Sequence, residues 1–542
     1  MALAAKEQRK QVMFDSLISA LDQQLGESSD HVVPFHEWPI TSKILLDGKQ
    51  FSYKKHEYLY GAYADTCPFQ VEIKATQGGW TSKAMLKVFY WARYCGTRYK
   101  GIGYYFPSRT DVTDLSKARL NPLIEDNPDT IGSWMRDVDA ANVKRIWNTS
   151  LYLRGLKSRV GMKSAPLDAL IIDELDEAPP TAIDMVLERM AHSEEGDFLA
   201  LSNPTLPDYG IDRLFQTTNM MFFLLKCPKC NEWTDMVGTF PDCLHTLKGG
   251  RVIRACIKCG AELDPAKGEW VAKRPQITER HGRQWSQLYS QTKMTDPTLI
   301  LEKFHSTNNL TDFYNLKIGV AYVDAKNRLS KQEVFACCGD GGMFSESDTA
   351  TYMGVDQGKY LHVVIGKKGK KRGGEIIYIG VHKGNNPNDP NDDSGWKDLD
   401  ALMKRFKVGR CVVDAMPSKK NARAFADRFP GRVFMCYYND NQKGSYKWNE
   451  GEKIVQCDRT ESLDYSHDVI SGQDVTLPRQ SDIVDTFADH CHNIAKKLEV
   501  DDESGSSKYV YVKLGDDHFR HSFNYLQLCI KDSPELLFDE LL

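Results

Sequence analysis

The feature that most constrains this chain is an apolar run that ends in two adjacent carboxylates, Leu170-Ile-Ile-Asp173-Glu174. A short apolar run of this kind predicts a buried strand, whose end places both carboxylates at one edge of a sheet. Nucleotide hydrolysis uses such a pair, because one carboxylate holds Mg²⁺ and the other polarises the attacking water. We assign the first role to Asp173 and the second to Glu174; the alternative is a solvated strand end.

The length and composition bound the class of protein. The chain has 542 residues, of which 41% are hydrophobic and 27% charged, and a formal net charge of −4. This length indicates about two to four domains, at about 150 residues per domain. We find no apolar stretch near the roughly 20 residues of a membrane span and no signal-peptide core after Met1 to Lys10. We therefore expect a cytoplasmic protein without membrane contacts, whose nucleic-acid contacts would use local basic patches.

Apolar spacing divides the chain into five expected parts. The first 26 residues have the spacing of an amphipathic helix, which either docks on the surface or binds a partner. Short strands alternate with helical patterns up to about residue 225, which predicts a parallel α/β sheet. The expected parts are an N-terminal helical arm (1–38), an α/β core (39–225), a cysteine-bearing insert (226–270), a mostly helical lid or linker (271–345) and a second α/β domain (346–542).

A phosphate-binding loop is expected after the strand Val71–Ile73. The following residues, Lys74-Ala-Thr-Gln77-Gly78-Gly79-Trp80-Thr81-Ser-Lys83, place a glycine turn whose backbone N–H groups face phosphates, with Thr81 as an Mg²⁺ ligand. Trp80 stands where the lysine of such loops is usually found. Lys74 would supply the charge by folding back over the phosphates, and Lys83 is the competing candidate. A glycine turn that serves only packing is the alternative.

Two further segments fit the same site. The strand that ends at Ser202-Asn203-Pro-Thr205 offers small polar side chains that would sense the γ-phosphate and couple hydrolysis to movement. A plain strand-to-turn transition explains this segment as well. Arg119, in Ser116-Lys-Ala-Arg-Leu-Asn-Pro122, is a candidate for the arginine that stabilises charge in the transition state.

Two Cys-x-x-Cys pairs predict a structural zinc site. Cys227-Pro-Lys-Cys230 and Cys256-Ile-Lys-Cys259 have the spacing of two knuckles that bind Zn²⁺ through four thiolates. Four thiolates leave no open coordination position, so this site is not catalytic. Cys243 and His245 lie between the pairs and are either spare ligands or ordinary loop residues.

The last third of the chain carries an ordered set of carboxylates. Asp356 and Asp414 each leave an apolar strand, and Asp517 lies one helical turn from His521. Three such carboxylates can hold two Mg²⁺ or Mn²⁺ ions that activate water and stabilise the leaving oxygen of a phosphodiester. Asp516 is an alternative to Asp517, and each carboxylate alone has a structural interpretation. The basic run Lys367–Arg372 is either a phosphate-gripping tip or a solvated turn.

The chain resembles a known family, the large subunits of the DNA-packaging terminases of tailed bacteriophages, especially the lambda-like group. The resemblance covers about residues 40 to 530 in patches. It is carried by Phe51-Ser-Tyr-Lys-Lys-His56-Glu-Tyr58-Leu, Lys74-Ala-Thr-Gln-Gly-Gly-Trp-Thr81, Phe106-Pro-Ser-Arg109, Ser116 to Pro122, Asp173-Glu-Leu-Asp-Glu-Ala-Pro179 and Ser202-Asn-Pro-Thr205.

The resemblance implies a fold and several residue roles. It implies a P-loop ATPase domain of the additional-strand, RecA-like type with a zinc-ribbon-like insert, followed by an RNase H-like nuclease domain. It favours Lys74 over Lys83 and places His56 and Tyr58 near the adenine, with an aromatic core pair as the alternative. It makes Asp356, Asp414 and Asp517 metal ligands, whereas His521 departs from the acidic residue often found there and either ligates metal or orients a ligand.

The implied function is ATP-driven translocation of double-stranded DNA into a viral procapsid, with metal-dependent cutting of concatemers. The implied cofactors are ATP with Mg²⁺, two Mg²⁺ or Mn²⁺ ions at the nuclease site, and structural Zn²⁺. The implied partners are DNA, a small terminase subunit, the portal protein and further copies of the chain in a ring, in the host cytoplasm and transiently at the portal rather than in the mature virion. The rival functions are a helicase-nuclease of repair or defence and a non-catalytic zinc-containing DNA-binding scaffold.

Overall fold

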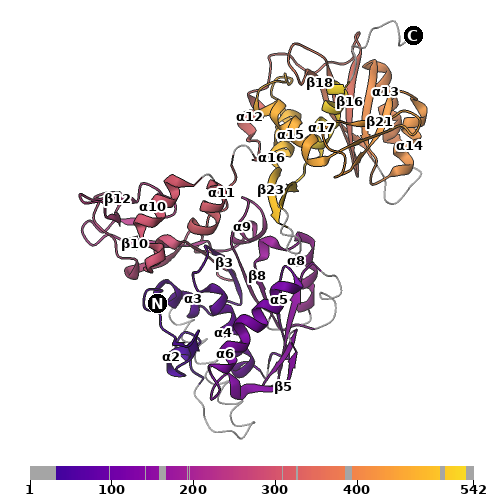
Figure 1. Cartoon of the computed structure of the whole chain (residues 1–542). Coiled ribbons are helices and arrows are strands. Elements are labelled where there is room, and N and C mark those ends of the chain that lie inside the picture. Colours follow the sequence, from indigo (N-terminus) through magenta and orange to yellow (C-terminus); the bar gives the residue numbers. More distant parts are fainter. Residues whose placement is uncertain are drawn as a thin grey trace. The chain divides into compact units, whose positions relative to one another are not determined.

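The computed structural model describes residues 32–532 except 97, 141, 158–165, 192, 194–195, 308, 325–326, 385–393 and 501–506. The helix expected in the first 26 residues lies outside the described residues. The chain divides into two compact units, Met1–Tyr322 and Val323–Leu542, each of which is described by itself (Figure 1). The segment 271–345, expected as one lid or linker, is therefore divided between the two units.

A large, mostly parallel sheet forms the centre of the first unit. Within the described residues it has 11 strands, in the order β11-β10-β15-β3-β9-β8-β4-β7-β6-β5, with β14 paired to β10. Neighbours from β10 to β7 run parallel, and antiparallel pairs close both ends. The strands of this unit are β1 (Leu45–Leu46), β2 (Lys49–Gln50), β3 (Phe69–Lys74), β4 (Gly101–Phe106), β5 (Met135–Ala140), β6 (Val143–Ile146), β7 (Thr149–Gly155), β8 (Ala169–Asp173), β9 (Asp197–Ser202), β10 (Met221–Lys226), β11 (Trp233–Asp235), β12 (Leu244–Thr246), β13 (Val252–Arg254), β14 (Gly268–Ala272) and β15 (His281–Trp285).

Helices cover both faces of this sheet, as buried parallel strands require. The longest, α4, follows β3 and buries aliphatic and aromatic side chains in the larger core cluster, whereas α8 and α9 pack into a second cluster on the other face. The helices are α2 (Trp38–Thr41), α3 (Tyr58–Tyr63), α4 (Trp80–Tyr94), α5 (Arg109–Leu115), α6 (Asn121–Glu125), α8 (Pro180–Leu187), α9 (Gly210–Phe215), α10 (Pro297–Ser306) and α11 (Leu310–Phe313), with π-helical turns at Ser116–Leu120 and Tyr314–Ile318.

Residues 271–345 are not mostly helical, contrary to the expectation from sequence. The strand β15 lies inside this segment and pairs with both β10 and β3 in the middle of the large sheet. Its sequence, His281-Gly-Arg-Gln-Trp285, lacks an apolar run, because the buried Arg283 is compensated by carboxylates rather than by apolar packing. The cysteine-bearing insert therefore begins and ends in the sheet, since β10 leads into it and β14 and β15 lead out of it.

The second unit is built on a 7-stranded sheet of described residues in the order β18-β17-β16-β19-β20-β22-β21. The first three strands are antiparallel, and β16, β19, β20 and β22 run parallel. The elements are α12 (Lys331–Phe335), β16 (Thr351–Gln357), β17 (Tyr360–Lys367), β18 (Glu375–Lys383), α13 (Ser394–Arg405), β19 (Val408–Asp414), α14 (Lys419–Arg428), β20 (Val433–Tyr438), β21 (Lys447–Asn449), β22 (Ile454–Cys457), α15 (Arg459–Ser471), α16 (Asp482–His492), the hairpin of β23 (Ile494–Val500) and β24 (Ser507–Lys513), and α17 (His518–Asp532).

The two faces of this second sheet bury separate cores. Helices α15, α16 and α17 gather on one face and α13 and α14 on the other (Figure 1). Side chains alternate between faces along each strand, so Val355 and Val413 point to the α13 side, whereas Tyr352 and Val412 point to the α17 side. The same alternation puts Asp356, His362 and Asp414 on the α17 face.

Helix α17 approaches the sheet closely at Gly354 in β16. A Cβ atom at this position would overlap the carbonyl oxygen of Ser522 and the amide nitrogen of Leu526 in α17. Because both are backbone atoms, the neighbour cannot move aside by a rotamer change.

Among the described residues, no helix combines the length and apolar character needed to cross a membrane.

We predict that Gly354→Ala destabilises the second unit by about 1 to 3 kcal/mol, the usual cost of forcing one methyl group into a packed contact. Urea denaturation of the full chain measures this loss. Gly341→Ala is the matched control, because a Cβ there meets no atom within 4 Å. Equal stability of the two variants would contradict the close approach of α17.

Candidate functional site

The carboxyl ends of four parallel strands, β15, β3, β9 and β8, meet at one edge of the first unit's sheet. The register aligns Trp285 of β15 with Lys74, Ile73 of β3 with Ser202, and Asp173 of β8 with Leu201 of β9. The strand β9 thus lies between the strand before the glycine loop and the strand that ends in Asp173. This order brings the loop, the carboxylate pair and the small polar segment together, as the sequence predicted.

Lys74 lies between the two carboxylates. Its ammonium nitrogen is 2.8 Å from Asp173 Oδ1 and 2.8 Å from Glu174 Oε1, and Thr81 Oγ1 donates to Asp173 Oδ2 at 2.9 Å. Burial lowers the pKa of Lys74, but the adjacent carboxylates outweigh it and hold this pKa above its usual value. Burial also raises the pKa of Glu174, despite the opposing effect of Lys74. The cluster therefore combines the buried Lys74 cation with carboxylate and hydroxyl oxygens, which are the ligand atoms that Mg²⁺ prefers.

The loop between β3 and α4 has the backbone of an anion site. Gln77 (φ 62°) and Gly79 (φ 79°) are left-handed, a conformation that turns successive N–H groups toward one point. Helix α4 begins directly after Gly79, and its N-terminus has neither a side-chain cap nor an acidic residue in the first turn. Its first N–H groups are therefore available to phosphate oxygens, which the helix dipole also attracts. Glu174 is left-handed too (φ 52°), so backbone strain gathers at this site.

Lys83, the competing lysine, lies elsewhere. Its ammonium group contacts Glu72 Oε1 at 2.7 Å and Gln70 at 3.1 Å, and Arg283 reaches the same Glu72 oxygen at 3.3 Å. This group is buried on the α4 side of the sheet. Trp80, which stands at the usual lysine position, is buried in the core with its ring near Trp270. The geometry thus favours Lys74 as the lysine of the glycine loop.

Three further predicted residues lie around the loop. The Tyr58 hydroxyl donates to the Gly78 carbonyl at 3.1 Å and lies 2.8 Å from His56 Nδ1. The ring of Tyr58 is buried against Trp285, so Tyr58 braces the loop from the core, while His56 is half-buried. Arg119 reaches the first turn of α4, where it donates to Ser82 Oγ at 3.2 Å.

The segment after β9 connects the loop with its surroundings. Asn203 Nδ2 donates to the Lys74 carbonyl at 2.7 Å, and Ser202 Oγ donates to the Asn203 carbonyl at 2.9 Å. The Thr205 carbonyl accepts from Asn315 at 3.0 Å. Nearby, the carbonyl of Leu316 accepts the backbone N–H of Thr76 at 2.8 Å. Residues 202–205 and the turn Tyr314–Ile318 therefore bind the loop from two sides.

The sequence did not point to two residues of this site. Tyr104 on β4 donates to Asp173 Oδ2 at 3.2 Å. Asp176, buried after the carboxylate pair, accepts from Thr205 N–H and Oγ1 at 2.7 Å each and from Ile211 N–H at 2.6 Å. The acidic run 173–177 was visible, but only the fold shows that Asp176 faces inward.

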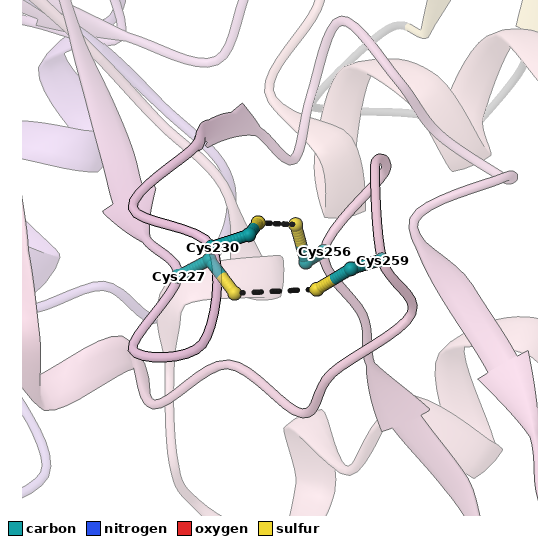
Figure 2. A group of neighbouring side chains, drawn as sticks. All are labelled: Cys227, Cys230, Cys256 and Cys259. Atoms are coloured by element: carbon teal, nitrogen blue, oxygen red, sulfur yellow. Dashed lines mark hydrogen bonds between the residues drawn. The ribbon is translucent and has the colours of Figure 1, made fainter.

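The four cysteines come together as predicted (Figure 2). Cys227 and Cys259 have sulfur atoms 3.6 Å apart, and so do Cys230 and Cys256. All four lie within 4.8 Å of one another. A tetrahedral Zn²⁺ ion with bonds of about 2.3 Å separates its thiolates by about 3.8 Å, so the spacing fits the ion, whereas a disulfide needs about 2.05 Å. Cys243 lies outside the quartet and donates to the Met236 carbonyl at 3.2 Å.

The two knuckles have matching backbones. Asn231 (φ 59°) and Gly260 (φ 68°) each follow the second cysteine of a pair in the left-handed conformation. Each donates its N–H to the first cysteine's carbonyl, Asn231 to Cys227 at 3.0 Å and Gly260 to Cys256 at 2.8 Å. The knuckles therefore present their sulfur atoms in the same way from opposite sides.

The acidic residues of the second unit end neighbouring strands or begin α17. Asp414 accepts the Met416 N–H at 3.0 Å, and burial, with the charge of Asp356, raises the pKa of Asp414 to about 6. Asp517 contacts Lys513 at 2.9 Å and His521 at 3.4 Å. Burial opposes these two neighbours, which nevertheless hold the pKa of Asp517 well below its usual range.

The closest partner of Asp356 is a residue that the sequence analysis missed. His518 Nδ1 lies 2.8 Å from Asp356 Oδ2, and this hydrogen bond raises the pKa of His518. His521 contacts Asp517 and Tyr438 instead. The run Asp516-Asp517-His518 was visible in the sequence, but its contact with β16 depends on how α17 packs.

In the basic run between β17 and β18, Lys367 and Arg372 pair with Glu375 and Asp474.

These features define a class of protein, an α/β unit with a glycine loop suited to phosphate binding and a second α/β unit with an acidic centre. Residues 71–283 match the family model described as the ATPase domain of the phage terminase large subunit gpA. A comparison with curated proteins gave no match. The match confirms the predicted resemblance of this segment to phage terminase large subunits.

A solved structure of a bacteriophage large terminase shares the fold. The large terminase of bacteriophage HK97 is 11% identical, with a TM-score of 0.51 over 92% of this chain and 100% of that chain. A large terminase from a thermophilic bacteriophage is 10% identical, with a TM-score of 0.30 over 89% of this chain and 98% of that chain. The HK97 comparison supports the fold alone, since the identity is low.

We predict that, without added Mg²⁺ or Mn²⁺, Asp414 lowers the free energy of unfolding as the pH rises. Its pKa of about 6 when folded exceeds the usual value of about 3.9, so its stabilising contribution is complete below about pH 4 and is lost as pH rises through about 6. The stability of Asp414→Asn relative to the wild type should therefore rise by about 2 kcal/mol between pH 4 and 7.5.

Urea denaturation at several pH values measures this difference. Asp348→Asn is the control, because the Asp348 side chain is 99% exposed and should show no such trend. A pH-independent difference for Asp414→Asn would contradict the raised pKa.

Proposed function

We propose that this chain is the motor and nuclease of a phage DNA-packaging machine, which moves double-stranded DNA into a procapsid with ATP and cuts concatemeric DNA. The observation that carries the proposal is the Lys74–Asp173–Glu174 cluster at the end of a left-handed glycine loop. A scaffold without catalysis has no need to hold a lysine between two carboxylates beside an uncapped helix N-terminus.

Each loop residue has a distinct part in ATP hydrolysis. The backbone N–H groups of Gln77, Gly78 and Gly79 cradle phosphates, and Lys74 supplies positive charge to them. Thr81 and Asp173 would hold the Mg²⁺ that accompanies ATP, whose charge would replace that of Lys74 and leave Lys74 free to contact the phosphates. Glu174, whose pKa is raised by burial, is suited to orient and polarise the attacking water.

Coupling to movement runs through Asn203. The Asn203 side chain donates to the Lys74 carbonyl, and the Asn203 backbone counteracts the rise in the pKa of Glu174. A change at the γ-phosphate would thus reach Thr205, which is bonded to Asn315 at the base of the turn Tyr314–Ile318. Arg119 is the proposed charge-stabilising arginine, and His56 and Tyr58 line the expected adenine side.

The second unit would carry the nuclease. Asp356, Asp414 and Asp517 would hold two Mg²⁺ or Mn²⁺ ions, with His521 positioning Asp517 through their contact. The influence of Asp356 on the pKa of Asp414 reflects a repulsion between two carboxylates that a divalent cation would relieve. Such ions activate water and stabilise the leaving oxygen of a phosphodiester.

The remaining parts of the proposal follow from the same family. The cysteine quartet would bind structural Zn²⁺ as a zinc-ribbon-like insert. The partners would be DNA, a small terminase subunit, the portal protein and further copies of the chain in a ring. The protein would act in the host cytoplasm and transiently at the portal, and would be absent from the mature virion.

We predict that Lys74→Ala lowers DNA-stimulated ATP turnover by at least about 100-fold, because it removes the charge that faces the phosphates. Lys83→Ala is the matched control. It should destabilise the fold by about 2 to 4 kcal/mol, since it breaks a buried ion cluster, but leave turnover per folded molecule near that of the wild type. Steady-state ATPase assays paired with thermal denaturation measure both quantities. Loss of turnover in Lys83→Ala with normal turnover in Lys74→Ala would contradict the assignment of Lys74.

We predict that the quartet holds one Zn²⁺ ion per chain, measured by elemental mass spectrometry. Cys256→Ser should lose the ion and lower the melting temperature, because three thiolates no longer close the tetrahedral site. Cys243→Ser is the control and should keep the ion, since the Cys243 sulfur donates to a backbone carbonyl instead. Equal metal content in the two variants would refute the zinc site.

A further inference from the structure

Histidines gather beside Asp356 on the α17 face of the second unit's sheet. Asp356 and His362 are direct cross-strand partners of β16 and β17, which places their side chains next to each other. His518 reaches the same point from the start of α17, with Nδ1 2.8 Å from Asp356 Oδ2. One ligand atom from each of these three residues lies within 4.8 Å of the others.

His362 carries an unused polar atom at this point. The residue is 8% exposed, and its Nδ1 atom has no hydrogen-bond partner among the described residues. Such an atom normally costs stability unless a ligand uses it. An imidazole nitrogen of this kind is a common metal ligand.

The third histidine nearby is already engaged. The Nδ1 atom of His490 accepts the backbone N–H of Phe519 at 3.2 Å, which fixes its ring at the start of α17. The rings of His362 and His518 are instead stacked, with centroids 4.6 Å apart and planes 14° apart. The ligand atoms of these two imidazoles and of Asp356 lie within 4.8 Å of one another, and the His490 ring lies beside both imidazoles.

We propose that Asp356, His362 and His518 together bind one divalent first-row transition-metal ion. Imidazole suits such ions, whereas Mg²⁺ prefers oxygen ligands only. A site with two imidazoles therefore selects Mn²⁺ and its neighbours in the row over Mg²⁺. Asp414 and Asp517 remain as oxygen ligands for a second ion, either Mg²⁺ or Mn²⁺. In the described structure, neither carboxylate has a histidine of this trio as a hydrogen-bond partner.

The role of this ion in DNA cutting rests on the proposed nuclease function, whereas ion binding itself does not. An ion at this trio would take Asp356 out of its hydrogen bond with His518 and fix its carboxylate toward the metal. The chain would then differ from an all-carboxylate nuclease in its choice of metal rather than in its reaction.

The direct test is pulsed electron paramagnetic resonance on the full chain loaded with Mn²⁺ in excess Mg²⁺. Mn²⁺ is the probe because it disfavours the thiolates of the cysteine quartet. We expect one Mn²⁺ per chain that Mg²⁺ does not displace, with hyperfine coupling to imidazole nitrogen. Bound Mn²⁺ without nitrogen coupling, or Mn²⁺ fully displaced by Mg²⁺, would overturn the proposal.

Variants test the ligands one by one. His518→Ala and His362→Gln should each weaken the Mg²⁺-resistant Mn²⁺ by at least tenfold and remove part of the nitrogen coupling. His382→Gln is the control, because His382 bonds the Tyr378 hydroxyl at 3.0 Å, away from the trio. If His362→Gln does not fold, His518→Ala and the wild-type spectrum decide the question. Unchanged affinity in His518→Ala would overturn the proposal.

Plasmid cutting separates this proposal from the nuclease function. Nitrogen coupling in a chain that cuts no DNA with either metal supports the metal site and contradicts the nuclease. Mg²⁺-driven or Mn²⁺-driven cutting without nitrogen coupling contradicts the metal site and supports the nuclease.

Discussion

The structure of the first unit depends on one buried charge contact, the Lys74 ammonium between Asp173 and Glu174. The contact joins β3 to β8 across the intervening β9, so it forms only if all three strands have the observed register. Removing the cation from these two carboxylates is costly unless another cation replaces it. On the proposed function, the positive charge of a metal ion would replace that of Lys74 when nucleotide binds, and the strands beneath the site could keep their positions.

Much of this arrangement was predictable from the sequence, because it rests on local patterns. Three features are local, because neighbouring residues alone determine their conformation. They are the apolar run before Asp173, the glycine turn after Lys74 and the paired spacing of Cys227 to Cys259. The strand β15 was not predictable, since its buried Arg283 is satisfied by Asp65 and Glu72, which lie far away in the chain. A hydrophobicity pattern cannot show a polar residue whose burial is compensated by distant partners.

The acidic centre of the second unit shows the same limit. Strand ends at Asp356 and Asp414 were evident, because each follows an apolar run. The contact between Asp356 and His518 was not, since it requires α17 to lie close to β16, which the absent side chain of Gly354 permits. Sequence spacing places residues on an element, whereas the packing of elements decides which of them touch.

The cysteine-bearing insert has both of its ends in the main sheet, with β10 leading in and β14 and β15 leading out. An insert whose two ends lie on neighbouring strands can be lengthened with little loss of stability, because the entropy of loop closure grows only with the logarithm of loop length. The tip of this excursion, around Gly249 and Gly250, is exposed, and a Cβ there meets no atom within 4 Å. This exposed turn is therefore a suitable place to insert a fluorescent or affinity module into the first unit without altering its glycine loop.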